Sequence, residues 1–171
     1  RTGEIIKGHV SLGSLRVRQD FLIAQGLLTP YENGTTPDPK LLEMAISRLR
    51  QLSAHEVGHT IGLNHNYASS FNNRASVMDY PHPQINLTNG AIDLSDAYDV
   101  GIGDWDKAAI NFGYRVFDSK TNEADELNKI MEKQFADGLF NISDQDARAP
   151  GGAHPFSHLW DNGKSPADEL N

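Results

Sequence analysis

The sequence predicts a predominantly helical α+β domain with a long central helix, a short edge strand or small sheet, and a loop-rich C-terminal part. Apolar and polar residues alternate near the N-terminus, as in a half-buried strand, and apolar residues recur at helical spacing after Asp38. From Asn64 to about Asp99 the chain is rich in Asn, Ser, Pro and Asp, which suits loops that wall a site. Its 171 residues are enough for one domain with its own core.

The first expected element is a strand, Ile5–Leu12. Its apolar side chains alternate with polar ones, so one face would be buried and the other exposed to water. Gly8 lies in the middle of this segment. A glycine there lets another backbone come close, which suits an edge strand, but it also fits a simple bulge.

Two helices should follow. The first runs from Leu15 to about Leu28 and stops before a Thr-Pro pair, and residues 31–37, which contain Asn-Gly and a proline, form a loop. Asp38 caps the second, long helix, and Pro39 at its first position has the backbone angle that a helix start needs. The core face expected for this helix consists of Leu42, Ala45, Ile46, Leu49 and Leu52.

The C-terminal part contains two more expected helices, Asp104–Tyr114 and one that Asn122 caps and that ends at Gly138. The residues after it should be mostly irregular. Ser165 followed by a proline then reads as the start of a helix that is cut off, so we expect the chain to be an excised piece of a longer protein. We expect a single domain over residues 1–171, divided into 1–64 and 65–171.

Composition limits the classes of partner. The net charge of -8 argues against nucleic acid and against an anionic membrane surface. The chain has no cysteine, which excludes disulfides and thiolate ligands and leaves the redox compartment open. No apolar run approaches the roughly 20 residues that span a bilayer. The oligomeric state is not indicated.

The run from His55 to His65 carries the chemistry. On a helix, His55 and His59 project from the same face because they are four residues apart. Glu56 lies beside them, where it can reach a water on a metal ion without binding the ion itself. Gly62 permits a tight turn that can bring His65 to the same ion. Three nitrogen ligands with an open fourth position are typical of a catalytic zinc site.

The alternative is a helix whose histidines are ordinary core or surface residues. That interpretation would place three histidines and a glutamate together without a purpose. The spacing also matches a motif in which two histidines bind zinc and the glutamate acts as general base. We therefore favour metal-dependent hydrolysis.

A second motif, Ser76-Val77-Met78-Asp79-Tyr80, follows one loop later. Together the two motifs resemble the metzincins, which have an extended three-histidine motif and a methionine-containing turn. The resemblance implies that Met78 forms an apolar floor under the metal, a role suited to a polarisable side chain; ordinary core filling is the alternative. It also implies that Tyr80 helps to stabilise the transition state.

More of the chain resembles the large multi-domain zinc metalloproteases of Bacteroidetes-type and related bacteria. The matching segments are Gly3–Val10, the long helix into H-E-V-G-H-T-I-G-L-N-H-N, Ser76–Pro81, and residues 146–163. This resemblance implies a secreted, periplasmic or cell-envelope location in a bacterium. The residue after the third histidine marks metzincin families, and it is Asn66 here, so the substrate class follows less directly than the reaction class.

The resemblance implies a zinc endopeptidase that acts on a peptide or protein substrate. Residues 1–64 would hold the strand, the first helix and the zinc-binding helix, and residues 65–171 the Met-turn and a C-terminal subdomain. Glu56 would be the general base and Tyr80 a donor to the oxyanion. In metzincins an edge strand pairs with the extended substrate, and here that strand would include Gly8, His9 and Val10.

Other interpretations stay open. The chain could be a zinc-binding module without activity, although the intact Glu56 argues against this, or a metal hydrolase that acts on another amide or ester. A set of carboxylates could hold calcium or could instead cap helices and solvate loops. They are Asp93, Asp96, Asp99, Asp104 and Asp106. The remaining histidines could contact ligand or lie in loops; they are His9, His82, His154 and His158.

Overall fold

The computed structural model describes residues 2–28, 38–147, 150, 154–165 and 167. The chain forms two compact units, Arg1–Ile61 with Pro83–Gly101 and Gly62–His82 with Ile102–Asn171. The described part is mostly helical with a small two-stranded sheet, which confirms the predicted α+β class. Each unit combines two stretches of chain, and the predicted division into residues 1–64 and 65–171 stays a prediction. The assignment of residues 1–171 to a single domain stays a prediction.

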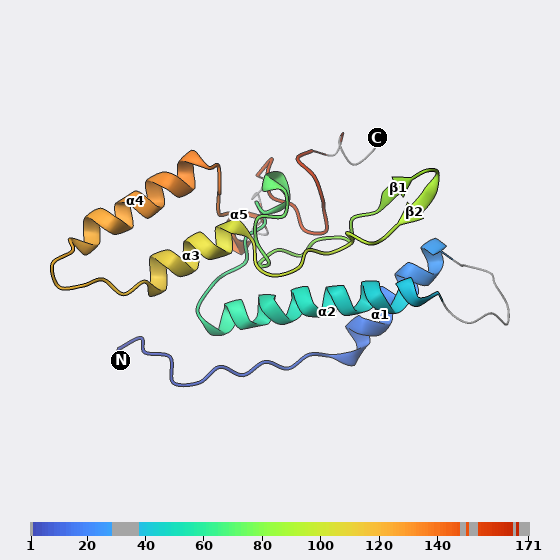
Figure 1. Ribbon diagram of the computed structural model, residues 1–171, viewed down its shortest axis with the longest axis horizontal. Coiled ribbons are helices and arrows are strands. Elements are labelled where there is room, and N and C mark those ends of the chain that lie inside the picture. Colours follow the sequence, from blue (N-terminus) through green and yellow to red (C-terminus); the bar gives the residue numbers. More distant parts are fainter. Residues whose placement is uncertain (1, 29–37, 148–149, 151–153, 166, 168–171) are drawn as a thin grey trace. The chain divides into compact units, whose positions relative to one another are not determined.

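The first unit is built on two helices that pack against each other, α1 (Ser14–Leu28) and α2 (Pro39–Thr60), as Figure 1 shows. Both begin close to where the sequence predicts. Asp38 caps α2, because its carboxylate accepts a hydrogen bond of 2.9 Å from the backbone N–H of Lys40. The apolar core of this unit consists of Ala24, Leu41, Met44, Leu94, Ala97 and Tyr98.

The buried face of α2 differs from the predicted one. Leu42, expected in the core, is 55% exposed, whereas the preceding Leu41 is 1% exposed. The face continues through polar side chains that a hydrophobic pattern cannot detect: Arg48 lies with its guanidinium 5.4 Å from the Tyr98 ring centre. The buried residues of α2 are Leu41, Met44, Ala45, Arg48, Gln51, His55 and Gly58.

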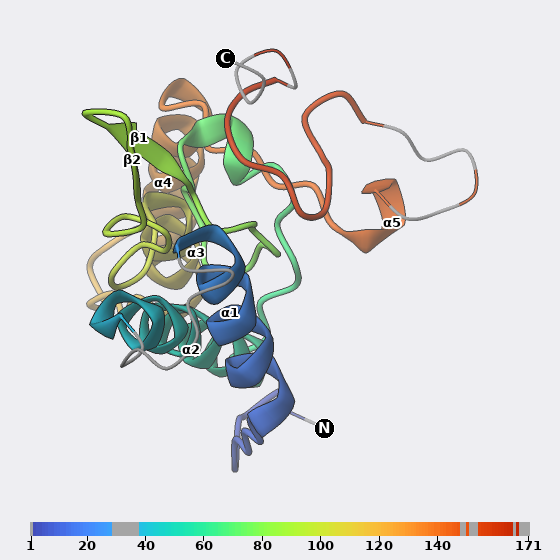
Figure 2. The same cartoon turned by 90° about the vertical axis from the view of Figure 1, so that its right-hand side faces the viewer.

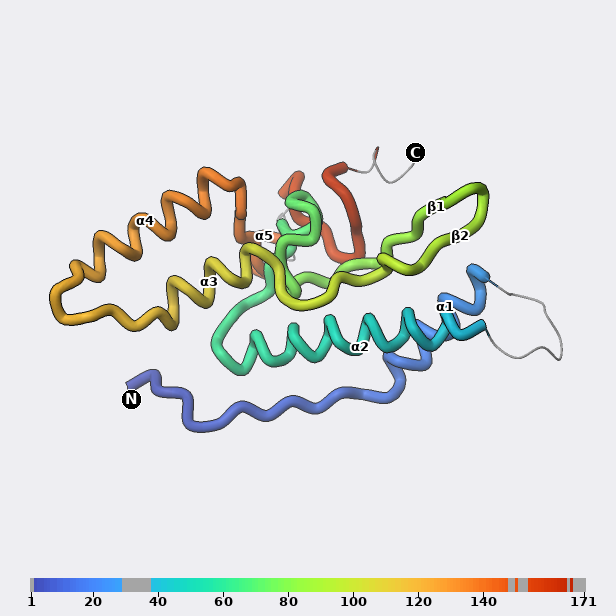
Figure 3. Tube along the Cα trace, in the orientation of Figure 1, coloured from blue at the N-terminus to red at the C-terminus, as the bar shows by residue number. Residues whose placement is uncertain are grey.

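The N-terminal segment, residues 2–13, contains no helix or strand and is exposed throughout (Figure 3). The predicted strand Ile5–Leu12 is therefore wrong for the described structure. A strand needs a hydrogen-bonded neighbour, and the alternation of side chains alone does not supply one. Gly8 does permit a close approach, because a Cβ at this position would lie 2.9 Å from the Cβ of Thr60. Its close neighbour is thus the end of α2.

A short hairpin completes the first unit. β1 (Asn86–Thr88) pairs antiparallel with β2 (Ala91–Asp93), with Leu87 opposite Ile92. Asn89 and Gly90 connect the strands with φ values of 54° and 79°, as a type I′ turn requires. This hairpin lies in the stretch that the composition assigned to loops. The Asn-Gly pair between two short β-prone runs was the signal that could have predicted it.

In its described residues, the second unit contains a 3-10 turn (Ser70–Asn72) and the helices α3, α4 and α5. α3 (Asp104–Tyr114) and α4 (Glu123–Ala136) pack against each other. α3 has the predicted bounds, and Asn122 caps α4 as predicted, but α4 ends at Ala136, two residues before the predicted end at Gly138. The short α5 (Asp144–Ala147) lies in the irregular C-terminal part, away from α3 and α4 (Figure 2).

Two sequence expectations involve residues outside the described ranges. The loop expected at residues 31–37 lies wholly outside them, and the helix start expected at residues 165–168 lies partly outside them. Among the helices that are described, none has the length and apolar character needed to cross a membrane.

Candidate active site

The last turns of α2 carry His55 and His59. Their Nε2 atoms lie 3.1 Å apart, and the two rings are nearly perpendicular, at 87°. Two neutral imidazoles could share a hydrogen bond at this separation. It also suits two ligands of one ion, because Zn–N bonds of about 2.0–2.1 Å place tetrahedral ligand atoms roughly 3.3 Å apart. His55 is 1% exposed, so packing holds its ring.

The chain turns directly after α2. Gly62 has φ 92°, which confirms the predicted tight turn and favours glycine. His65 follows three residues later. His55, His59 and His65 each offer a ring nitrogen, and these atoms all lie within 4.8 Å of one another. Three imidazole donors and no thiolate form a donor set that zinc accepts in catalytic sites, so these residues fit the metal that the sequence predicts.

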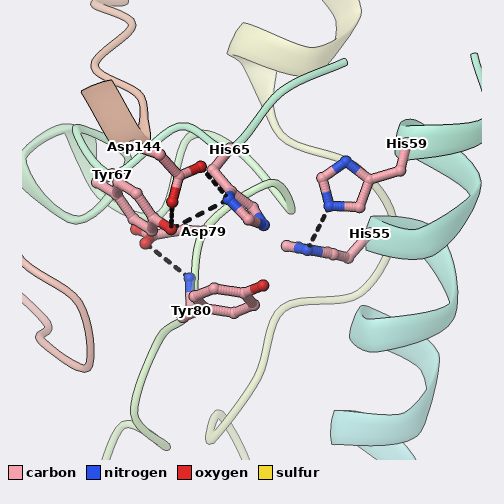
Figure 4. Close-up of polar contacts among 7 residues, drawn as sticks. All are labelled: His55, His59, His65, Tyr67, Asp79, Tyr80 and Asp144. Carbon is pink, nitrogen blue, oxygen red and sulfur yellow. Dashed lines mark hydrogen bonds and ion pairs between the residues drawn. The ribbon is translucent and has the colours of Figure 1, made fainter. Parts of the chain in front are cut away.

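His65 contacts two oxygen atoms through its other ring nitrogen (Figure 4). Nδ1 lies 2.6 Å from Oδ2 of Asp144 and 3.1 Å from the hydroxyl of Tyr67. The Tyr67 hydroxyl in turn donates to Oδ1 of Asp144 at 2.9 Å. These three side chains form a closed triangle of polar contacts on the side of the ring away from Nε2.

Asn66, the residue that departs from better-known metzincins, is fully buried and joins three segments. Its side-chain amide donates to the carbonyl of Phe140 at 3.0 Å, and its side-chain oxygen accepts from the backbone N–H of Ile142 at 3.2 Å. Its own backbone N–H donates to the carbonyl of Met78 at 2.9 Å. An amide can donate and accept at once, which neither aspartate nor leucine can do.

The Met-turn is held by a buried carboxylate at the start of α3. Asp106 accepts hydrogen bonds from the Ser76 hydroxyl at 2.6 Å and from the backbone N–H groups of Val77 and Gly103, each at 2.8 Å. Burial raises the pKa of Asp106, although these donors oppose the rise. Met78 is fully buried, so a core position is established for it. Its role beneath a metal stays a prediction.

Gly103 permits this close packing. A Cβ at Gly103 would lie 1.8 Å from the carbonyl oxygen of Ala75, so no larger residue fits without a backbone shift. The same carbonyl accepts from the backbone N–H of Trp105 at 2.9 Å. The start of α3 therefore packs against Ala75 and is hydrogen-bonded to it, shortly before Met78 in the chain.

Tyr80 lies between two rings. Its ring centre is 4.7 Å from that of His65 and 5.5 Å from that of Trp160, with which it stacks at 15°. The backbone N–H of Trp160 donates to the carbonyl of Tyr80 at 2.9 Å. Trp160 has φ 62°, an unusual angle for a bulky residue, which the surrounding contacts must hold in place.

Asp79 is a buried acid beside Tyr80. Burial raises its pKa to about 8, and the nearby carboxyl of Asp161 adds to the rise. The backbone N–H of Tyr80, which donates to Oδ1 of Asp79 at 2.7 Å, opposes the rise but does not cancel it. The folded protein therefore favours the neutral form of Asp79 over most of the physiological range.

The remaining predicted site residues lie as follows. Glu56 is half-buried on α2, next to His55 in sequence, and its role as base stays a prediction. Gly8, His9 and Val10 lie in the exposed extended segment, where Nε2 of His9 is 3.1 Å from the Ser11 hydroxyl. Their role in substrate binding also stays a prediction.

Three of the carboxylates considered for calcium have other partners. Asp106 caps α3, Asp104 pairs with Lys107 at 2.8 Å, and Asp93 accepts from the backbone N–H of Ser95 at 2.9 Å. The one group of three or more metal-binding side chains found in the described ranges is His55, His59 and His65. The other histidines do not join it: the His82 ring lies 6.0 Å from Trp160, and the His154 ring 5.5 Å from Phe156.

Sequence reasoning did not assign roles to several residues around the site. Asp144 and Tyr67 contact His65, and Asp106 holds the Met-turn, yet none of them belongs to a short motif. Asp144 is 79 positions from His65 in the chain, so local spacing could not reveal the contact. Trp160 stood in a segment that supports the family resemblance, but its stacking on Tyr80 was not predicted.

Comparison with known families agrees with this geometry. A family model described as Met-zincin matches residues 37–171, which include all three histidines and the Met-turn and exclude the exposed N-terminal segment. Neither the curated proteins nor the solved structures gave a match.

Proposed function

Since the chain belongs to the Met-zincin family, we propose that it is a zinc-dependent endopeptidase whose zinc ligands are His55, His59 and His65. The observation that carries the proposal is the grouping of the three ligand atoms within 4.8 Å. Neutral imidazole nitrogens are ligands that zinc prefers, and three of them leave a position for water or substrate. When bound, zinc supplies Lewis acidity, which polarises a carbonyl and acidifies water.

Each remaining site residue has one task in this proposal. The Glu56 carboxylate takes a proton from the attacking water and passes it to the leaving amine. The Tyr80 hydroxyl donates to the oxygen that becomes negative as the peptide carbonyl is attacked. The Tyr80 ring is held for this task by its contacts with His65 and Trp160. Met78, which is buried, would form the apolar floor of the site when zinc is bound.

We also propose that the substrate binds as an extended peptide along Gly8, His9 and Val10. Main-chain pairing gives affinity for many sequences without a particular side chain. The segment supports this role because residues 2–13 are exposed and their trace runs extended (Figure 3). Its contact with Thr60 places Gly8 beside the helix that carries two of the three histidines.

Two measurements on matched variants test the reaction. Elemental analysis after incubation with zinc should give about one zinc per folded chain, and His59→Ala should lose most of it. Glu56→Ala should keep the zinc and lose turnover of a peptide library by a factor on the order of 10² or more. Glu43→Ala is the control, because Glu43 is an exposed carboxylate on the same helix.

The outcomes separate the alternatives. No zinc in the folded chain would overturn the proposal. Zinc uptake with no cleavage would favour a zinc-binding module, and cleavage of esters or small amides but not peptides would favour another hydrolase. Tyr80→Phe should keep zinc and lower kcat more than it changes KM, because its hydrogen bond forms as charge develops. Unchanged kinetics would remove Tyr80 from the mechanism.

A further inference from the structure

The contacts of His65 specify where its proton lies. Nδ1 faces the Asp144 carboxylate at 2.6 Å and the Tyr67 hydroxyl at 3.1 Å. An ionised carboxylate can accept hydrogen bonds but cannot donate one. A tyrosine hydroxyl has a single proton, and Tyr67 gives its proton to Oδ1 of Asp144 at 2.9 Å. Neither neighbour has a proton left for Nδ1.

Nδ1 must therefore carry the proton in this network. A neutral imidazole has one N–H and one bare nitrogen, so an Nδ1–H ring has its lone pair on Nε2. A metal ligand needs that bare nitrogen. The triangle of His65, Tyr67 and Asp144 thus selects the one tautomer in which Nε2 of His65 can bind an ion.

We propose that Asp144 is the positioning residue of the third metal ligand. It holds the His65 ring in orientation, fixes the Nδ1–H tautomer and makes Nε2 a better donor through its negative charge. The inference rests on the proposed function, since it takes His65 to be a zinc ligand. Carboxylates in this position behind a ligating histidine are known to strengthen metal binding.

The fold brings Asp144 to this place through Asn66. The side chain of Asn66 bonds to the backbone of Phe140 and Ile142, and the backbone N–H of Tyr67 donates to the Ile142 carbonyl at 2.7 Å. Asp144 follows two residues later, as the first residue of α5. Asn66, which follows His65, therefore holds in place the segment that carries Asp144, the partner of His65.

Tyr67 supports the arrangement from inside the unit. Its side chain is fully buried, whereas the side chain of Asp144 is 43% exposed and that of His65 is 15% exposed. A half-exposed carboxylate would otherwise sample several rotamers. The Tyr67 hydroxyl restrains one carboxylate oxygen, so that the other stays directed at Nδ1.

The test compares three variants of the full chain. Asp144→Ala removes acceptor and charge, Asp144→Asn keeps an acceptor but removes the charge, and Asp146→Ala is the control. Asp146 is an exposed carboxylate in the same short helix. Zinc affinity is measured by competition with a chromophoric chelator. We expect a loss of about 10- to 100-fold for Asp144→Ala, a smaller loss for Asp144→Asn, and none for Asp146→Ala.

A second readout needs no metal. Ring nitrogen shifts of ¹⁵N-labelled histidine in the zinc-free protein report the tautomer, and His65→Gln identifies the His65 signals. The parent chain should show Nδ1–H at His65, and Asp144→Ala should lose this preference. Asp144→Asn should keep the preference, because an amide oxygen can still accept from Nδ1.

The two readouts distinguish the possible failures. Tight zinc binding by the parent chain with unchanged affinity and tautomer in Asp144→Ala would overturn the role of Asp144 alone. Absence of zinc binding by the parent chain would overturn the proposed function, and the tautomer of His65 would still test the proton assignment. If Asp144→Ala does not fold, the affinity of Asp144→Asn decides: equality with the parent chain would contradict a role for the charge.

Discussion

The two parts of the candidate metal site are held in different ways. His55 and His59 lie on α2, where a regular helix sets their spacing and one carboxylate caps the start. His65 lies in irregular chain, where side chains hold the backbone in place. Asn66 bonds to three other residues through its side chain, and Asp106 accepts from three donors around the Met-turn.

Because of this difference, α2 and the loop-borne part of the site should tolerate substitution differently. Along a helix the hydrogen bonds are repeated, so most side chains can change if the buried face is kept. In the loops, single polar residues satisfy several buried groups at once, and a buried polar group without a partner is costly. The loop-borne part should therefore be sensitive to the loss of individual polar side chains, and α2 should be sensitive mainly to packing.

The largest effect should come from Asp106→Ala in the loop-borne part. The change leaves the Ser76 hydroxyl and two backbone N–H groups without their buried acceptor, and each such group costs about 1–3 kcal/mol. We expect a loss of at least about 3 kcal/mol in the free energy of unfolding, measured by urea denaturation with circular dichroism. Asp104→Ala should cost less than about 1 kcal/mol, because its ion pair with Lys107 is exposed. Equal losses in Asp106→Ala and Asp104→Ala would contradict the special role of the buried Asp106 carboxylate.

On α2 the corresponding change is Leu41→Ala. Leu41 is 1% exposed, so truncation leaves a cavity and should cost about 2–5 kcal/mol. Leu42→Ala should stay within about 0.5 kcal/mol, because Leu42 is 55% exposed. The two neighbours lose the same atoms, so their difference measures burial alone. If Leu42→Ala cost more than Leu41→Ala, the buried face of α2 would be the one predicted from the sequence, which includes Leu42.

A smaller loss is expected for Asn66→Asp. The substitution keeps the size of the side chain but removes its donation to the Phe140 carbonyl and places a carboxyl in a fully buried position. We expect a loss of about 2–4 kcal/mol, and hydrogen exchange should increase in residues 140–147 before it increases in α2. Asn111→Asp on the exposed side of α3 should change neither quantity.

The last prediction concerns the pH dependence of the free energy of unfolding, tested with Asp79→Asn. Its expected size over one pH unit is smaller than each of the losses above. The pKa of Asp79 is raised by burial from 3.8 to about 8, so the folded chain holds a proton that the unfolded chain has released between these values. Stability from this group is full below pH 3.8 and is lost as pH rises toward 8. The parent chain should lose about 1 kcal/mol per pH unit between pH 5 and 7 relative to the variant. Parallel pH profiles would contradict the raised pKa, and Asp146→Asn serves as an exposed control.

Much of the helical structure could be predicted because its signals are local. Asp38 with Pro39 marks the start of α2, Asn122 marks that of α4, and α3 has the predicted bounds. The buried face of α2 could not be predicted from apolar spacing, because it includes Arg48, Gln51 and His55. Their burial depends on partners elsewhere in the chain.

The site divides in the same way. The spacing of His55, His59 and His65 predicts their grouping, and Gly62 predicts the turn between them. The partners of His65 could not be predicted, because Asp144 reaches it across 79 positions and is placed by the contacts of Asn66. The expected strand at residues 5–12 shows the opposite case, since a local alternation was present without a neighbouring strand.

The position of Trp160 gives the protein an optical property of its own. The chain has two tryptophans, Trp105 and Trp160, and both lie in the second unit. Trp105 is 7% exposed, whereas Trp160 is 42% exposed and stacks on the Tyr80 ring. In Trp105→Phe the remaining indole is a single emitter beside Tyr80. Under the proposed function, a peptide that binds at Tyr80 should displace water from this indole and shift its emission, so the unlabelled chain would report substrate occupancy.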